Sequence, residues 1–130
     1  MKKKIALVIG AGSSLGSAVA RSFSKEGFTV VVARRTGEEL SKLKEEIENY
    51  GGSCFPFSLD ARKEEDVIRF ANKALEVEEN AAAYYYLGFA KSDINNNKEA
   101  LKDLDKAIKI DSDDARYFYV RGNVKRSLND

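Results

Sequence analysis

Histidine and tryptophan are absent from the 130 residues of this chain, and cysteine and proline occur once each. Without histidine, the chain lacks the side chain that most often acts as a general base near neutral pH and most often binds metal ions. The single cysteine, Cys54, excludes an internal disulfide and suits a reducing compartment, so we expect a cytoplasmic protein. No apolar run approaches the ~20 residues of a membrane helix, and Ile5–Ile9 is too short for the core of a signal peptide.

The chain also has no excess of positive or negative charge, because its net charge is only +1. Residues 1–75 hold 13 basic and 10 acidic side chains, which gives +3, and residues 76–130 hold 9 and 11, which gives −2. Neither part has the excess of charge that indicates a nucleic-acid or membrane-surface partner. We therefore expect neither.

A glycine-rich turn directly follows the apolar run Ile5–Ile9, and a helical pattern follows the turn. Glycine lets the backbone pass close to a phosphate, and a helix N-terminus offers free N–H groups and the positive end of a dipole. The turn therefore predicts a site for the pyrophosphate of a dinucleotide. Its candidate residues are Gly10, Gly12, Ser13, Ser14, Leu15 and Gly16.

Strands and helices are expected to alternate in the first part of the chain. Strand patterns cover 4–9, 29–34 and 54–59, and helical patterns cover 14–26, 38–50 and 64–78. This alternation predicts an α/β unit with three parallel strands in the order 3-2-1. Leu15, Val19 and Phe23 recur every four residues and predict an apolar stripe that packs against the sheet.

Residues 3–70 resemble the short-chain dehydrogenase/reductase family. The resemblance rests on the glycine turn, on Val30–Arg35 and on Ser58-Leu59-Asp60. The family's turn is usually Gly-x-x-x-Gly-x-Gly. Here Gly10 and Gly16 match the outer glycines, and Ser14 replaces the middle one.

Basic residues at the end of the second strand indicate the kind of cofactor. An acid there would accept hydrogen bonds from the ribose of NAD, but Arg34 occupies this position and Arg35 follows. A guanidinium binds phosphate bidentately, so the sequence favours NADP; the alternative is two solvated loop arginines. The resemblance implies that Asp60 hydrogen-bonds the adenine amino group, whereas alone it would pass for the N-cap of the next helix.

The family's catalytic pattern does not occur in this sequence. Short-chain dehydrogenases use a tyrosine, a lysine four residues later and an upstream serine. None of the six tyrosines here has a lysine at that offset, and the Asn-Asn-Ala-Gly segment of the family is missing as well. We therefore assign no catalytic residue and expect no dehydrogenase activity from this chain alone.

A period of 34 residues begins at residue 81 and resembles the tetratricopeptide repeat. Tyr84, Leu87, Gly88, Ala100 and Ala107 match positions of that repeat at which aromatic, apolar or small side chains pack two helices together. One full repeat covers 81–114, and 115–128 supplies the first helix of another. We thus predict a truncated Rossmann-type unit over 1–75 and a short all-α helical stack over 76–130.

Four interpretations remain open from the sequence, and two of them are an active reductase whose tyrosine and lysine come from a partner chain and a recombined chain without an evolved function. We favour a non-catalytic fusion, recombined in nature or engineered, whose helical repeat binds a peptide or protein or associates with itself. Polar contacts to a partner are expected from Lys91, Asn95, Asn123 and Arg126. The alternative is weak binding of NADP(H) without hydride transfer, through the glycine turn, Arg34, Arg35 and Asp60.

Overall fold

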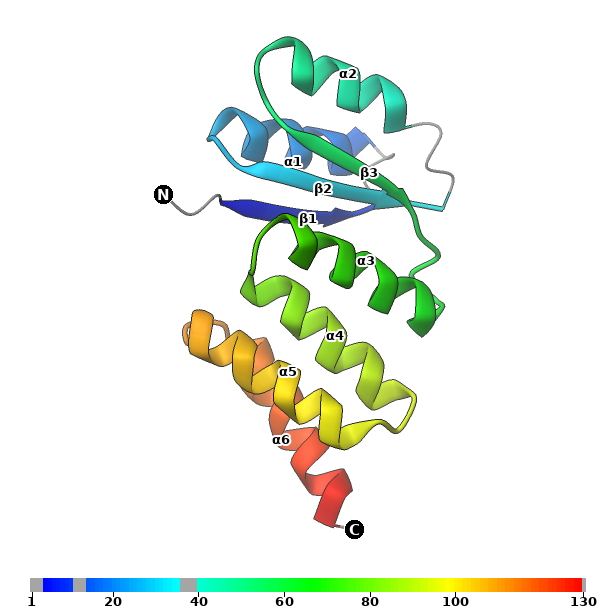
Figure 1. Cartoon of the computed structure of the whole chain (residues 1–130), viewed down its shortest axis with the longest axis vertical. Helices are drawn as coiled ribbons and strands as arrows, with labels where there is room; N and C mark the ends of the chain where they lie inside the picture. Colours follow the sequence, from blue (N-terminus) through cyan, green and yellow to red (C-terminus); the bar gives the residue numbers. More distant parts are fainter. Residues whose placement is uncertain (1–3, 11–13, 36–39, 130) are drawn as a thin grey trace. The chain divides into compact units, whose positions relative to one another are not determined.

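A three-stranded sheet and six helices make up the part of the chain that the computed structural model describes, residues 4–10, 14–35 and 40–129 (Figure 1). The described structure divides into two compact units, residues 1–61 and 62–130. In chain order the elements are β1 (Ile5–Ile9), α1 (Ser14–Lys25), β2 (Thr29–Arg34), α2 (Ser41–Asn49), β3 (Cys54–Ser58), α3 (Glu64–Val77), α4 (Ala81–Asp93), α5 (Asn97–Ile110) and α6 (Ala115–Asn129).

The first unit is built on a parallel sheet with the order β1-β2-β3. Ile9 of β1 is level with Ala33 of β2, and Arg34 of β2 is level with Ser58 of β3. β2 is the central strand, and its apolar run is buried, as expected for a strand in the middle of a parallel sheet. The predicted strands and their order are confirmed.

One face of this sheet carries α1 and α2 (Figure 1). Leu40, the N-cap of α2, and Leu43 and Ile47 within the helix are each 5% exposed or less and join Val30 and Val32 in one core cluster. Their spacing along α2 places them on a single helix face. This face anchors α2 on the sheet.

The apolar stripe predicted for α1 was wrong. Leu15 is 75% exposed, and Val19 and Phe23 are more than a third exposed. The residues of α1 that are buried are Ala20 and Ser24. Small side chains let a helix approach a neighbour closely, and this approach determined the buried face instead of the spacing of the larger apolar residues.

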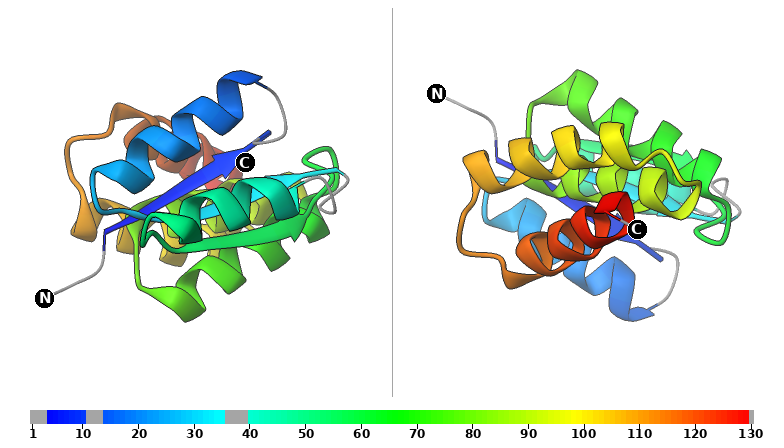
Figure 2. Two further views of the ribbon diagram at one scale, coloured as in Figure 1. Left: turned by 90° about the horizontal axis from the view of Figure 1, so that it is seen from above. Right: turned by 90° about the horizontal axis from the view of Figure 1, so that it is seen from below.

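The second unit consists of four helices, α3 to α6, and each packs against the next along the chain (Figure 2, right). Asn80 caps α4, because its side chain accepts a hydrogen bond from the Ala83 N–H at 2.8 Å. α4 and α5 lie close together at Gly88, where an added Cβ would come within 2.6 Å of Leu104 Cγ. Glycine at this position is therefore required by the packing of the two helices.

The boundary between the two units lies between Ala61 and Arg62, so α3 belongs with the helices of the second unit. From the sequence we placed a change of family pattern at about residue 75, inside α3. The boundary after Ala61 separates two sets of contacts within the fold. The change at about residue 75 separates two stretches that resemble different protein families. The division at residue 75 stays a prediction.

Candidate functional site

Three strand ends bring most of the predicted nucleotide-binding residues to one edge of the sheet. Gly10 follows β1, Arg34 and Arg35 close β2, and Asp60 lies two residues beyond β3. Because the strands are parallel and in register, their carboxyl ends meet at the same edge. The fold thus gathers residues that are 50 positions apart in the sequence.

Gly10 turns the chain out of β1 in a backbone conformation that favours glycine. Its φ is +87°, and its N–H donates to the Ala33 carbonyl oxygen at 2.7 Å, so the turn is anchored to β2. The direction of its missing Cβ is open, with no atom within 4 Å. A ligand can approach the backbone here without meeting a side chain of this residue.

The middle of the glycine turn, including Gly12 and Ser13, lies outside the described residues. Helix α1 begins at Ser14 at the same edge of the sheet, with Ser14 and Leu15 exposed and Gly16 half-buried. Its first N–H groups have no partner within the helix, which is the general condition for binding an anion at a helix N-terminus.

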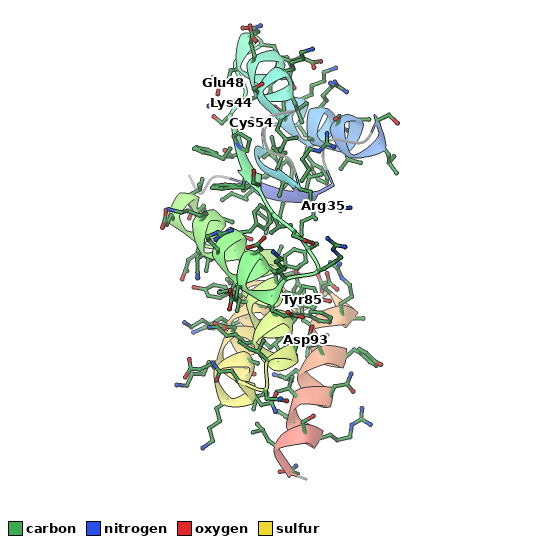
Figure 3. All side chains as sticks on the ribbon, turned by 90° about the vertical axis from the view of Figure 1, so that its right-hand side faces the viewer. Arg35, Lys44, Glu48, Cys54, Tyr85 and Asp93 are labelled. Atoms are coloured by element: carbon green, nitrogen blue, oxygen red, sulfur yellow. The ribbon has the colours of Figure 1, made fainter. Side chains whose placement is uncertain are left out.

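Arg35 is exposed at the end of β2 (Figure 3), and Arg34 is half-buried beside it. The carbonyl oxygen of Arg34 accepts a hydrogen bond from the Leu59 N–H at 2.9 Å. This bond holds the exit of β3 against the end of β2, directly before Asp60. A guanidinium and a carboxylate are thereby positioned on neighbouring strand ends.

Asp60 is half-buried and does not cap the following helix. The N-cap of α3 is Lys63, which is in extended conformation and makes no side-chain capping bond. The reading of Asp60 as a simple N-cap was therefore wrong. The hydrogen bond from the adenine amino group to Asp60 stays a prediction.

Cys54 lies on β3 beside an ion pair of α2, in which Lys44 Nζ and Glu48 Oε1 are 2.8 Å apart (Figure 3). Burial raises the pKa of the Cys54 thiol to about 11. Because the thiolate is the nucleophilic form, this cysteine is poorly reactive at neutral pH. It is a residue of the core and adds nothing to the candidate site.

A cavity that we did not predict lies at the opposite, amino-terminal edge of the sheet. It measures about 460 Å³ and is lined by the ends of α1 and α2, including Ser24, Tyr50 and Gly52. In the described part of the chain, Ser24 Oγ is the buried side-chain polar atom without a hydrogen-bond partner. The Ser24 hydroxyl fits at this position because residue 52 is glycine; a Cβ on residue 52 would clash with Ser24 Oγ.

In the helical unit, three of the four residues from which we expected polar contacts to a partner form bonds within the unit. Lys91 Nζ pairs with Asp103 Oδ2 at 2.8 Å, and Asp103 is buried, so this lysine joins α4 to α5. A guanidinium N–H of Arg126 donates to the Asn123 side chain. Asn95 and Asn123 line a cavity of about 280 Å³ together with Phe89.

A parallel sheet covered by helices, with a glycine turn after the first strand and charged residues after the next two, defines a Rossmann-type α/β unit. The model of the short chain dehydrogenase family matches residues 4–83. The chain therefore belongs to the short-chain dehydrogenase family. The matched range ends within α4, beyond the point at which we placed the change of pattern.

Oxidoreductases are among the curated proteins that this chain resembles. A probable 2,4-dienoyl-CoA reductase of Caenorhabditis elegans is 41% identical over 63 residues, which are 48% of this chain and 20% of that protein. The uncharacterized oxidoreductase YvrD of Bacillus subtilis is 32% identical over 89 residues, which are 68% of this chain and 34% of that protein. This chain thus spans about a fifth to a third of the length of these relatives.

Solved structures of short-chain dehydrogenases have a similar fold. One from Rhodopseudomonas palustris is 28% identical with a TM-score of 0.57, over 82% of this chain and 57% of that one. A metagenomic short-chain oxidoreductase in complex with NADP is 20% identical with a TM-score of 0.60, over 83% and 57% of the two chains. Within the described residues, no helix has both the length and the apolar character needed to cross a membrane.

Proposed function

We propose that the first unit binds the adenosine end of NADP(H) without transferring hydride. The observation that carries this proposal is the gathering of Gly10, Arg35 and Asp60 at the carboxyl edge of one parallel sheet. Ligands of open α/β sheets bind at this edge. A neighbour in fold, the metagenomic oxidoreductase, is described in complex with NADP, which supports the choice of ligand.

The residues fit the chemistry of this ligand. The open backbone at Gly10 and the N-terminus of α1 suit the pyrophosphate. Arg34 and Arg35 suit the 2′-phosphate, because guanidinium groups form charge-assisted bonds to phosphate oxygens. The Asp60 carboxylate accepts hydrogen bonds and suits the adenine amino group.

Hydride transfer is not expected from these 130 residues. No tyrosine of the sequence has a lysine four positions later, so the pair that the family uses for proton transfer is missing. Bound cofactor would be held by one half of its usual crevice. We therefore propose weak binding, with a regulatory or vestigial role, in a protein of the cytoplasm.

Calorimetric titration of the chain with NADPH and NADH tests this proposal. We expect saturable binding of NADPH and affinity for NADH weaker by about tenfold or more, because a charged hydrogen bond contributes about 1.5–3 kcal/mol. Replacing both arginines, Arg34→Ala and Arg35→Ala, should abolish the preference. NADPH should stay unoxidised when carbonyl compounds are added.

A matched control removes the same charge elsewhere. The double variant Lys4→Ala and Lys25→Ala changes two exposed basic residues at the opposite, amino-terminal edge of the sheet, one directly before β1 and one at the end of α1. It should bind NADPH as the unmodified chain does. Equal loss of binding in both double variants would show a general charge effect and refute the site.

We propose as a second function that residues 76–130 are a tetratricopeptide-like module for binding a protein or peptide, joined to the first unit by recombination. The specific observation in favour is an aromatic rim around the 280 Å³ cavity between α4 and α6. Phe89 is 44% exposed and Tyr119 is 71% exposed on this rim. Exposed aromatic side chains are enriched where proteins bind partners.

Selection from a random peptide display library, with the chain immobilised, tests this second function. Selected peptides should bind the unmodified chain and lose affinity for the Phe89→Ala and Tyr119→Ala variants. The matched control is Tyr50→Ala, which removes an exposed aromatic ring from the first unit. Peptides that bind all variants equally would speak against the module.

A further inference from the structure

Helix α6 repeats, 34 positions later, the residues by which α4 contacts α5. In α4 these are Tyr84, Gly88 and Lys91, at positions i, i+4 and i+7, which share one face of a helix. The corresponding residues of α6, each 34 positions later in the sequence, are Phe118, Gly122 and Lys125.

On α4, each residue of this set has a defined contact with α5. Gly88 lets the backbone of α4 approach Leu104, since an added Cβ would lie 2.6 Å from Leu104 Cγ and 3.1 Å from the Ala100 carbonyl oxygen. Lys91 Nζ pairs with Asp103 Oδ2 at 2.8 Å. A small residue, an acid and a leucine of α5 thus fit this face of α4.

A second contact of this face is a cation over an aromatic ring. Lys106 of α5 places Nζ 5.3 Å from the ring centroid of Tyr84. Tyr84 is accordingly only 8% exposed, and Asp103 is 7% exposed. The aromatic, glycine and lysine set of α4 is therefore covered by an amphipathic helix.

On α6, the same set is uncovered within the described part of the chain. Phe118 is 42% exposed, against 8% for its equivalent on α4. An added Cβ at Gly122 would meet nothing within 4 Å. Lys125 is exposed, and it forms no ion pair with any described residue.

The uncovered set is not the face by which α6 packs onto its own unit. That face carries Tyr117, Val120 and Val124, which are 3%, 8% and 3% exposed. Val120 and Val124 share a core cluster with Leu104 of α5. The set of Phe118, Gly122 and Lys125, which we call the α6 outer face, points elsewhere on the helix and is available for a partner.

We propose that the α6 outer face binds a partner helix with the chemistry of α5: a small residue, an acid three positions later and a leucine directly after the acid. On α5 these are Ala100, Asp103 and Leu104. The proposal rests on the second proposed function and names its partner. It concerns a different face of α6 from the one that lines the cavity beside Phe89.

Charge favours a separate helix that places an acid against Lys125 over a second copy of α6. Four basic residues and no acid occur in α6, which spans Ala115–Asn129. Two such helices placed face to face would bring Lys125 against like charge, which is unfavourable. An acid on the partner gives Lys125 the carboxylate that Lys91 has on α4.

Beside the α6 outer face, one position differs from α4 in charge. Arg121 replaces Leu87; its guanidinium lies 5.3 Å from the ring centroid of Phe118 and pairs with Asp105 at 3.0 Å. The arginine is thus held by its own unit, and its aliphatic stem flanks the outer face. A partner helix still meets the aromatic ring, the glycine and the lysine.

A synthetic peptide of residues 95–112, labelled with a fluorophore, is the probe for the proposal. Its anisotropy is followed as the full chain is added. We expect saturable binding that weakens on the order of tenfold or more in the Lys125→Glu variant. A peptide carrying Asp103→Lys should bind that variant with restored affinity and bind the unmodified chain weakly.

Two further variants separate this site from others. Lys109→Glu makes the same change of charge at an exposed residue in the last turn of α5, outside both proposed binding surfaces, and it should leave peptide binding intact. Gly122→Leu fills the open space and should abolish binding. If the peptide bound only by displacing α5 from α4, neither Lys125→Glu nor Gly122→Leu would change its affinity. That result would overturn the proposal.

Failure of this proposal can be distinguished from failure of the second proposed function. Partners that depend on Phe89 and Tyr119 but ignore Lys125 and Gly122 would keep the interaction module and refute the outer face. Sedimentation gives the remaining outcome. A dimer of the chain that Gly122→Leu converts to a monomer would assign the face to a second copy and overturn the partner helix.

Discussion

Alanine placed at Gly88 and at Gly122 should change stability in opposite directions, although both glycines lie on helices and are 34 residues apart. Alanine in a helix interior is favoured over glycine by about 1 kcal/mol. At Gly122 nothing lies within 4 Å of the new Cβ, so only this gain applies. Gly122→Ala should therefore stabilise the chain by about 1 kcal/mol.

At Gly88 the same gain is opposed by overpacking. The new Cβ would lie 2.6 Å from Cγ of Leu104, whose side chain is completely buried, and 3.1 Å from the Ala100 carbonyl oxygen. Relief requires a shift of α5, and overpacking of this kind costs about 3 kcal/mol. After the gain in helix propensity, Gly88→Ala should destabilise the chain by about 2 kcal/mol.

Unfolding in urea, followed by tyrosine fluorescence, measures both variants. Because the chain has no tryptophan and five of its six tyrosines lie beyond residue 80, this signal reports mainly on the helical unit. Adding Leu104→Ala to Gly88→Ala should cost less than the two single changes together, because the shortened side chain makes room. Equal stabilisation at both glycines would refute the close contact of α4 and α5.

Two further predictions concern polar groups of the helical unit. The hydrogen bond from Tyr84 to Glu79 at 2.7 Å, with burial, raises the pKa of Tyr84 to about 12. As pH rises, Tyr84 of the unfolded chain loses its proton at a lower pH than Tyr84 of the folded chain, so the free energy of unfolding should fall between about pH 10 and 12. Urea titrations at each pH measure this fall, and Tyr84→Phe should reduce it. Lys91→Met leaves the buried Asp103 carboxylate unpaired and should cost about 3 kcal/mol, whereas adding Asp103→Leu should restore most of the loss; equal stability of the two variants would contradict the buried pair.

The strands, and the edge of the sheet at which the candidate residues lie, could be predicted because their causes are local. The apolar run of β2 between charged and polar residues predicts a buried strand, and alternation with helices predicts parallel pairing. Parallel pairing alone then places Arg35 and Asp60 at one edge. Both features follow from the order of strands and helices along the chain, whatever the side-chain contacts are.

Other features depend on contacts between distant residues and could not be predicted. The buried face of α1 is determined by how closely Ala20 and Ser24 approach their neighbours, and Gly52, 28 residues after Ser24, is part of that approach. The role of Lys91 depends on Asp103, which is one of many acids in the sequence. Periodicity along one helix carries no information about either.

The connection between α4 and α5 has a consequence for competition between binding sites. Three residues, Ile94, Asn95 and Asn96, join the two helices, and Asn95 turns the chain with a φ of +63°. Such a short tether gives α5 an effective concentration at α4 in the millimolar range or above. A free helix of the same sequence therefore loses to α5 at the first of the two equivalent surfaces and gains access only to the second. Selectivity between two faces of like chemistry is then a matter of chain connectivity, and it would be preserved even if their side chains were identical.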